Sequence, residues 1–145
     1  MLIRDILANK PSSEIYAVSI KDTVSTAAEM LSAKRIGAVL VRDDSLALKG
    51  ILSERDIVRE IGKRGVDCME DCVADIMTKS VKSCAMGDTP QAVMKMMTDG
   101  RFRHMPVMEG DDLVGVISIG DAVAARITEI KLDNDAMMEM IAGNA

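Results

Sequence analysis

A serine followed three residues later by an aspartate occurs twice in this sequence, each time directly after a short apolar run. The first copy is Gly50 to Asp56 (GILSERD), and the second is Gly115 to Asp121 (GVISIGD). An aspartate in the first turn of a helix can accept two hydrogen bonds from a vicinal diol such as that of a ribose. Helix N-terminal amides favour phosphate, and glycine permits close approach to the backbone. These stretches, the first corner (50–56) and the second corner (115–121), are therefore predicted to bind a ligand.

The same spacing also has a purely structural explanation. Ser53 and Ser118 would be helix caps, with Asp56 and Asp121 at the third helical position, as in a capping box. The glycines would then only relieve crowding. Both explanations can hold together, with the serine capping the helix and the aspartate facing a cleft. The spacing alone leaves both open.

The two corners belong to a longer internal repeat, which is the first thing to look for in such a chain. Matches lie 70 residues apart at the start (5 and 75), 66 in the middle (22 and 88) and 65 at the corners (50 and 115). The matched segments are Asp5-Ile6-Leu7 with Asp75-Ile76-Met77, Asp22-Thr23 with Asp88-Thr89, Arg35 with Arg101, and Val41 with Val107. Their order is kept, so the chain is a duplicated unit.

Hydrophobic period and capping residues predict the order β-α-β-β-α in each unit. Strands are expected at 17–20, 38–41, 48–52, 81–84, 103–108 and 113–117, and helices at 23–35, 53–62 or 53–65, 90–99 and 119–130. We expect an α/β (α+β) fold in which the two units pack with pseudo-twofold symmetry, their sheets facing each other.

The expected domains follow the order of the repeats. They are unit one at 1–65, unit two at 66–130, a linker at 62–72 and a Met-rich tail at 131–145. Within the tail, residues 132–141 are predicted to form a short, partly amphipathic helix that needs a surface to lie on.

Composition restricts the class of protein. The chain has 145 residues, of which 48% are hydrophobic, with no tryptophan, one Tyr, one Phe and 13 methionines, so the core must be aliphatic. A net charge of −5 argues against nucleic acid as a partner. No apolar run reaches the length of a membrane span, and the first residues lack the apolar region of a signal peptide, so a cytoplasmic protein without a membrane partner is expected. Cys68, Cys72 and Cys84 are expected to be free thiols and not metal ligands.

The doubled pattern resembles a tandem pair of cystathionine-β-synthase (CBS) domains, a Bateman module, standing without an attached enzyme. The resemblance covers about residues 3 to 128. It is carried by the two corners and the repeated segments, with Arg101-Phe102-Arg103-His104-Met105-Pro106-Val107 before the second hairpin. It implies an adenine nucleotide as regulatory ligand: AMP, ADP, ATP, or in some cases NADH or S-adenosylmethionine. It also implies a twofold dimer shaped as a flat disc, with no cofactor required.

The resemblance assigns roles to individual residues. Asp56 and Asp121 would take ribose hydroxyls, with Ser53 and Ser118 near the ribose or phosphate. The base would be flanked by Val39 and Leu40 in one unit and by Met105 and Pro106 in the other. Thr23 and Thr89, which open the first helix of each unit, complete the candidate set together with Arg55, Arg103 and His104.

The two units differ where a phosphate would lie. Arg103 and His104 correspond to Gly37 and Ala38, whereas Arg55 in the first corner corresponds to Gly120. A guanidinium is a permanently charged fork suited to phosphate, and a histidine gains a proton near neutral pH. The alternative for His104 is a packed or surface histidine. We expect unequal clefts, the second favouring charged ligands.

Three functions are compatible with these residues. The first is a nucleotide-binding regulatory module, without catalysis, that acts on a partner protein. The second is a structural dimer or adaptor with empty clefts. The third is a small nucleotide-processing enzyme that uses His104 and Asp121 as an acid–base pair, although the sequence shows neither a P-loop nor a nucleophile paired with a base. A homodimer is expected, because apolar helix surface and the Met-rich tail need a docking face.

Overall fold

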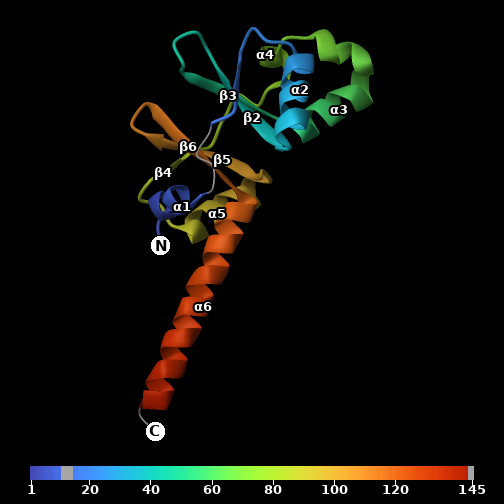
Figure 1. Ribbon diagram of the computed structural model, residues 1–145. Coiled ribbons are helices and arrows are strands. Elements are labelled where there is room, and N and C mark those ends of the chain that lie inside the picture. Colours follow the sequence, from blue (N-terminus) through green and yellow to red (C-terminus); the bar gives the residue numbers. More distant parts are fainter. Residues whose placement is uncertain (11–14, 144–145) are drawn as a thin grey trace. The chain divides into compact units, whose positions relative to one another are not determined.

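The computed structural model describes residues 1–10 and 15–143 (Figure 1). The elements are α1 (Ile3–Asn9), β1 (Ala17–Ser19), α2 (Val24–Lys34), β2 (Ala38–Arg42), β3 (Leu48–Ser53), α3 (Glu54–Arg64), a 3-10 helix η1 (Val66–Glu70), α4 (Val73–Ile76), β4 (Cys84–Ala85), α5 (Pro90–Gly100), β5 (His104–Glu109), β6 (Asp112–Ser118) and α6 (Ile119–Gly143). The predicted β-α-β-β-α order is confirmed in both repeats.

Each repeat supplies one three-stranded sheet, in the order β1-β2-β3 and β4-β5-β6. β1 runs parallel to β2, with Val18 opposite Val41, and β2 runs antiparallel to β3, with Val39 opposite Leu52. β4 runs parallel to β5, with Cys84 opposite Val107. The predicted α/β class, with two repeated units, is confirmed. One strand differs in position from the prediction: a strand was expected at 81–84, whereas β4 covers only Cys84 and Ala85.

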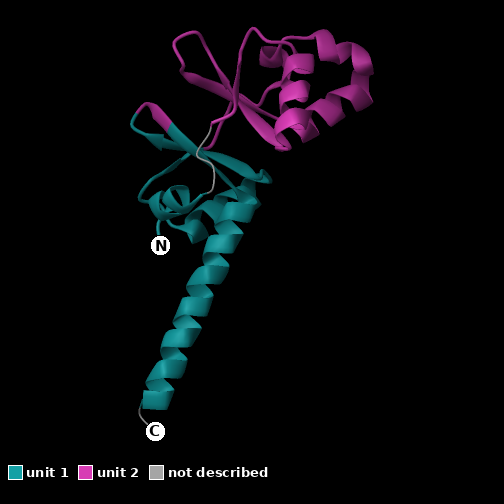
Figure 2. Cartoon of the chain, in the orientation of Figure 1, with its two compact units in different colours: residues 1–13, 83–110, 114–145 teal, residues 14–82, 111–113 magenta. Residues whose placement is uncertain are grey.

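The chain forms two compact units, and the segments that make up each unit differ from those of the sequence repeats (Figure 2). One unit contains residues 1–13, 83–110 and 114–145, and the other contains residues 14–82 and 111–113. The short helices α1 and α4 are exchanged, because each packs with the sheet of the other repeat. The domain boundary expected between residues 65 and 66 separates the two sequence repeats. The division into compact units differs from it because the helices α1 and α4 are exchanged.

Equivalent contacts hold the two exchanged helices. The amide of Ile3 donates to the carbonyl of Asp88 (2.9 Å), and the amide of Val73 donates to the carbonyl of Asp22 (2.8 Å). Ile3 and Val73 are fully buried in their respective cores. Both helices were missed from the sequence, because seven and four residues are too few to establish a helical period. The segment expected to be a linker, 62–72, holds the end of α3 and the whole of η1.

Both cores are aliphatic, as predicted. One is built on Ile3, Val93, Met97, Met105, Val107 and Ile117, and the other on Val24, Ala27, Val39, Val41, Leu52 and Val73. The three cysteines are free, with Cys68 and Cys84 buried and Cys72 exposed. Burial, with a contribution from nearby Asp88, raises the pKa of the Cys84 thiol to about 11.

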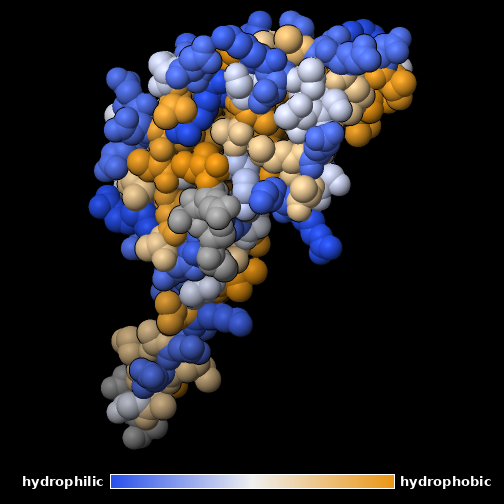
Figure 3. Space-filling view, turned by 45° about the horizontal axis from the view of Figure 1, so that its top comes forward, coloured by the Kyte–Doolittle hydropathy of each residue, from blue (hydrophilic) through white to orange (hydrophobic). Residues whose placement is uncertain are grey.

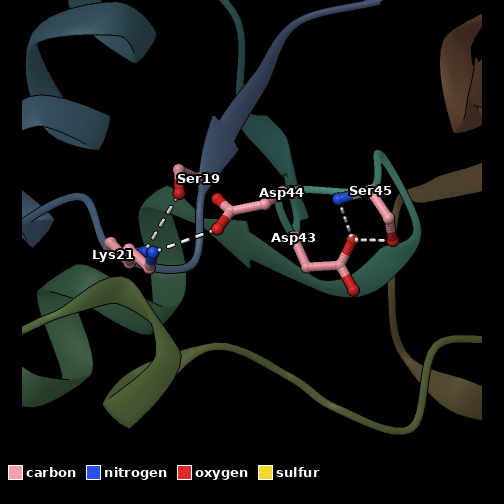
Figure 4. Close-up of polar contacts among 5 residues, drawn as sticks. All are labelled: Ser19, Lys21, Asp43, Asp44 and Ser45. Atoms are coloured by element: carbon pink, nitrogen blue, oxygen red, sulfur yellow. Dashed lines mark hydrogen bonds and ion pairs between the residues drawn. The ribbon is translucent and has the colours of Figure 1, made fainter.

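Asp43 organises the hairpin between β2 and β3 (Figure 4). Its Oδ1 accepts from the Ser45 hydroxyl (2.7 Å), the Ser45 amide (2.9 Å) and the Ala47 amide (3.0 Å). The Ser45 hydrogen bond is the main cause of the lowered pKa of this carboxyl. The next residue, Asp44, pairs with Lys21 at 3.0 Å. A side chain that binds backbone amides a few residues ahead explains the polar turn predicted here.

Residues 132–141 are helical as predicted, but they do not form a short helix of their own. α6 runs without interruption from Ile119 to Gly143, so the helix predicted at 119–130 and the tail helix at 132–141 are one element. The reason is that no proline or glycine lies between Asp121 and Ala142, and most residues there are good helix formers. Residues 144–145 of the expected tail lie outside the described residues.

No helix among the described residues is both long enough and apolar enough to cross a membrane.

Candidate functional site

The first corner is a capping box. Ser53 caps α3, and its hydroxyl oxygen accepts from the amide of Asp56 at 3.2 Å. In return, Oδ2 of Asp56 accepts from the amide (2.9 Å) and the hydroxyl (3.1 Å) of Ser53. Asp56 is only 8% exposed, so these hydrogen bonds are what makes its burial tolerable. The structural explanation of the Ser-x-x-Asp spacing therefore holds here.

The second corner has the same geometry and one additional partner. Oδ2 of Asp121 accepts from the Ser118 amide (2.9 Å), and the Asp121 amide donates to the Ser118 hydroxyl (3.0 Å). Lys10, just after α1, lies 2.9 Å from Oδ2 of Asp121 and also donates to the carbonyl of Val116 (2.9 Å). The repeat places Ser80 at the position of Lys10 (80 − 10 = 70), so the first corner has no equivalent lysine.

Lys10 was missed by sequence reasoning. The only available signal was its difference from Ser80 within the repeat. Nothing in the local pattern linked it to residue 121, because the exchange of α1 brings them together.

The backbone amides of both corners are largely used within the protein. The first four amides of a helix have no partner inside it. In the first corner, the amides of Ser53 and Asp56 are bound by the capping box, and that of Glu54 donates to the carbonyl of Gly37 (2.9 Å). In the second corner, the amide of Ile119 donates likewise to the carbonyl of Arg103 (2.8 Å).

Of the amides of the capping serine and of the first three helical residues in each corner, those of Arg55 and Gly120 are the two that have no acceptor outside the backbone of their own helix among the described residues. One amide per corner is a weaker phosphate site than an uncapped helix N-terminus would be. The charge needed to hold a phosphate must therefore come mainly from side chains.

The two carboxylates differ in what they can still accept. Oδ1 of Asp56 is paired with Arg59 at 3.2 Å, and the Arg59 side chain is 60% exposed. Oδ1 of Asp121 makes no hydrogen bond with any described residue, and the Asp121 side chain is more exposed than that of Asp56 (23% against 11%). The second corner therefore has the more available acceptor.

Asp121 is ionised at neutral pH. Burial raises the pKa of its carboxyl. The hydrogen bonds from the Ser118 amide and from Lys10 together lower this pKa by more than burial raises it, so the net shift is downward. An ionised carboxylate with a free oxygen accepts hydrogen bonds from hydroxyl groups strongly.

Close packing explains the corner glycines. A Cβ on Gly50 would lie 2.6 Å from Sδ of Met77 and 2.8 Å from the carbonyl oxygen of Thr78. A Cβ on Gly115 would lie 2.9 Å from both Cδ atoms of Leu7. Leu7 and Met77 are equivalent in the repeat (77 − 7 = 70), so each exchanged segment packs on a corner glycine. The glycines thus relieve crowding, as the structural explanation required.

The residues expected beside the base are all buried. Val39 and Met105 belong to the two aliphatic cores. Neighbouring residues in a strand point to opposite faces of the sheet, so Leu40 and Pro106 point away from these cores. Leu40 and Pro106 are therefore the better candidates for contact with a base.

The remaining candidates lie close to the corners in the chain or at helix caps. Arg103 is exposed, and its carbonyl ties it to the second corner through Ile119. His104 begins β5 and is half-buried, and Arg55 is exposed in the first turn of α3. Thr23 and Thr89 cap α2 and α5, accepting from the amides of Thr26 and Ala92, each at 3.2 Å. No hydrogen bond between described residues joins either threonine to a corner.

Comparison with known proteins gives consistent findings. The sequence model of the CBS domain family matches residues 3–63 and 73–127. The mitochondrial CBS domain-containing protein CBSX3 of Arabidopsis thaliana is 37% identical over 114 residues, which cover 74% of this chain and 54% of that protein. The chain therefore spans about half the length of this relative.

Solved structures extend the comparison. The crystal structure of the CBS-domain containing protein ATU1752 from Agrobacterium tumefaciens has a TM-score of 0.83 and 39% identity, covering 86% of this chain and 92% of that one. The crystal structure of CBSX2 in complex with AMP has a TM-score of 0.73 and 24% identity, covering 90% and 98%. The latter likeness is one of fold.

Proposed function

Because the chain belongs to the CBS-domain family, we propose that it is a regulatory module that binds adenine nucleotides and acts on a partner protein without catalysis of its own. The observation that carries the proposal is the second corner, where Asp121 is ionised and keeps one carboxylate oxygen unengaged among the described residues. AMP in the complex of CBSX2, a protein of the same fold, supports the choice of ligand class. AMP, ADP and ATP are the first candidates, and NADH and S-adenosylmethionine the next.

In this proposal the second corner binds the nucleotide through side chains. Oδ1 of Asp121 accepts from the ribose hydroxyls, while Lys10 holds Oδ2 and so fixes the carboxylate. Arg103 and His104 provide charge for the phosphate, and Pro106 flanks the base. The amide of Gly120 is the one helix amide left for the ligand among the described contacts.

The first corner is the weaker site in this proposal. Oδ2 of its ribose acceptor, Asp56, is held by Ser53, and Oδ1 is paired with Arg59, so a ligand must displace an exposed guanidinium before Oδ1 is available. Ser53 caps the helix, Arg55 provides the charge for a phosphate, and Leu40 flanks the base. This difference between the two carboxylates supports the unequal clefts expected from the sequence.

A regulatory role fits the chemistry of the second corner better than catalysis does. A general base works best when its pKa lies near the operating pH, whereas Asp121 has a pKa below its ordinary value. Among the described residues there is no group of three or more His, Cys, Asp or Glu side chains that could hold a metal ion.

One observation favours a second candidate, a structural adaptor with empty clefts. Most polar groups of both corners are satisfied by the protein itself, so the fold does not require a ligand. The homodimer and the cytoplasmic location expected from the sequence are compatible with both the regulatory module and the structural adaptor.

Thermal unfolding with and without each candidate nucleotide separates these functions. A ligand that binds only the folded state stabilises it by about 2.7 kcal/mol at a hundredfold excess over Kd. We expect at least one adenine nucleotide to raise Tm, with no product formed on prolonged incubation as followed by chromatography. A Tm unmoved by millimolar AMP, ADP, ATP, NADH and S-adenosylmethionine would leave the adaptor, and nucleotide turnover would indicate the enzyme.

A further inference from the structure

One side of α6 carries a seven-residue pattern that the single chain leaves exposed. Spacings of four and three residues alternate through the six residues Val123, Ile127, Ile130, Asn134, Met137 and Ile141. This average period of 3.5 residues keeps all six on one side of the helix. We call these six residues the α6 seam. The exposed fraction of its apolar members ranges from 37% at Val123 to 66% at Ile141.

The unit to which α6 belongs uses another side of the helix. Ala122 and Ala125 are buried in its core, where α6 contacts α5. Every residue from Lys131 to Gly143 is exposed. Figure 1 shows this part of α6 (orange to red) continuing past α5 and α1, with no other element of its unit beside it. In the space-filling view, the same part carries apolar residues between the hydrophilic ones (Figure 3).

The chemistry of the projecting part argues against a membrane as the covering surface. Helices that lie on membranes carry lysine and arginine on their polar side. Between 131 and 143 the charged residues are Lys131 against Asp133, Asp135 and Glu139, so the projecting part is acidic. An alternation of three and four residues is instead the pattern by which one helix packs against another.

Asn134 indicates which helix would pack against the α6 seam. With Ile127, Asn134 and Ile141 at the a positions of the heptad, Val123, Ile130 and Met137 occupy the d positions. A single asparagine at an a position specifies register and oligomeric state in coiled coils. In a parallel, in-register pair of identical helices, each a residue faces its own copy, so the two asparagine amides can hydrogen-bond to each other.

An antiparallel pair would place a residues opposite d residues. Asn134 would then face apolar side chains such as Ile130 or Met137, and its amide would be buried without a partner. A different helical partner would have to supply a polar group at this one level, whereas a second copy supplies it automatically.

We propose that the α6 seam pairs with the same seam of a second copy of this chain, as a parallel, in-register two-stranded coiled coil. The seam is about 27 Å long, from 1.5 Å per residue between Val123 and Ile141. Met138 and Met140 flank it at the e and g positions and widen the apolar contact, while Leu132 and Glu139 occupy f positions on the opposite side. Arg126, a g residue that would approach Lys131 of the other copy, is already paired with Glu129 at 3.3 Å, which reduces the repulsion.

This inference rests on the homodimer within the proposed function and adds the surface, orientation and register. Its first test is the mass of the full chain, by sedimentation equilibrium at micromolar concentrations. The seam variant carries Ile130→Lys and Met137→Lys. The matched control carries Leu132→Lys and Glu139→Lys, which place two lysines one heptad apart on the opposite side. All four positions are exposed in the single chain, so both variants should keep the fold, and circular dichroism checks this.

We expect a dimer for the wild type and the control, and a rise of about a hundredfold or more in the dimer dissociation constant of the seam variant, because two apolar contacts are lost in each chain. A monomeric wild type, a seam variant that dimerises like the wild type, or a control that dissociates equally would each overturn the proposal.

Disulfide cross-linking tests orientation and register. In a Cys72→Ser background, which leaves only the buried Cys68 and Cys84, Asn134→Cys should form a linked dimer in a glutathione redox buffer. Asp135→Cys, one residue away at a b position, should not. A seam-dependent dimer that fails to cross-link at position 134 would overturn the parallel register.

Measurement of nucleotide binding tests the proposed function separately from the coiled coil. The seam lies outside both corners, so the seam variant should show the same nucleotide-induced Tm shift as the wild type. A seam-dependent dimer that ignores every adenine nucleotide would defeat the nucleotide proposal and leave the coiled coil standing.

Discussion

Lys10 and Asp121 belong to different sequence repeats, yet their side chains form a 2.9 Å ion pair at the second corner. The pair exists because α1 is exchanged and packs with the sheet of the second repeat. Lys10 also donates to the carbonyl of Val116, so one ammonium group joins the last strand of the unit to the first turn of α6. The carboxylate of Asp121, which the proposed ribose contact requires, is thereby held in place by Lys10 at the end of α1.

Lys10→Met should change how stability depends on pH. A carboxyl whose folded-state pKa lies below its unfolded value adds stability above the unfolded pKa, and this stability is lost as pH falls through the folded pKa. The pKa of Asp121 is lowered, partly by Lys10, so removing the ammonium should raise it and move the acid loss of stability to higher pH. Both side chains of the pair are partly exposed, so we expect a cost of about 0.5–1 kcal/mol at pH 7.

Urea unfolding between pH 3 and 7 measures this effect. Lys21→Met is the matched control, because Lys21 pairs with Asp44 on the open surface, where both side chains are more than 70% exposed. An equal change in the two variants would mean that the second corner does not depend on Lys10.

Arg103→Ala should weaken AMP binding about tenfold or more and leave adenosine binding nearly unchanged, because a charge-assisted hydrogen bond contributes about 1.5–3 kcal/mol. The substitution keeps the Arg103 carbonyl that holds the amide of Ile119, so the corner itself should survive. Asp121→Ala should weaken both ligands, because they share the ribose. Calorimetric titration of AMP and adenosine into the three proteins checks this. Equal weakening of AMP and adenosine by Arg103→Ala would make Arg103 structural.

Local spacing explains how much of this fold could be predicted. The capping boxes at Ser53 and Ser118 depend only on a serine and a carboxylate three residues apart, which the sequence states directly. The match of Arg35 with Arg101 likewise corresponds to one structural feature, since each ends a helix in the left-handed conformation with φ of 54° and 56°. Such features need no knowledge of distant segments.

What the sequence did not predict depends on contacts between distant segments. Local period cannot reveal that Leu7 packs on Gly115 and Met77 on Gly50, because each pair joins parts of different repeats. The same exchange hides Lys10 from a search for site residues. The length of α6 was missed for another reason: the helix propensity of residues 131–142 continues after the residues that pack against α5 have ended.

Gly50→Ala should destabilise the protein more than Gly115→Ala. The new methyl group at position 50 would meet the Thr78 carbonyl oxygen at 2.8 Å, and this backbone group is fixed by hydrogen bonds with Ile51. At position 115 the nearest atoms belong to the Leu7 side chain, which can move. We expect losses of about 3 and about 1 kcal/mol, within the range for overpacked sites. Chemical denaturation of both variants measures the difference, and a larger loss at 115 would contradict the packing account.

Leu46 and Gly110 test the cost of left-handed backbone in the two hairpins, because they share that conformation with different side chains. Their φ angles are 66° and 62°, and a Cβ on Gly110 would meet no heavy atom within 4 Å. Gly110→Ala should therefore cost about 1 kcal/mol through backbone strain alone. Leu46→Asn should stabilise the protein by about 0.5 kcal/mol, because asparagine tolerates this conformation and Leu46 is 67% exposed, with little packing to lose. Thermal and urea unfolding of the two variants measure both effects. A destabilising Leu46→Asn would mean that the Leu46 side chain makes a contact that its exposure does not reveal.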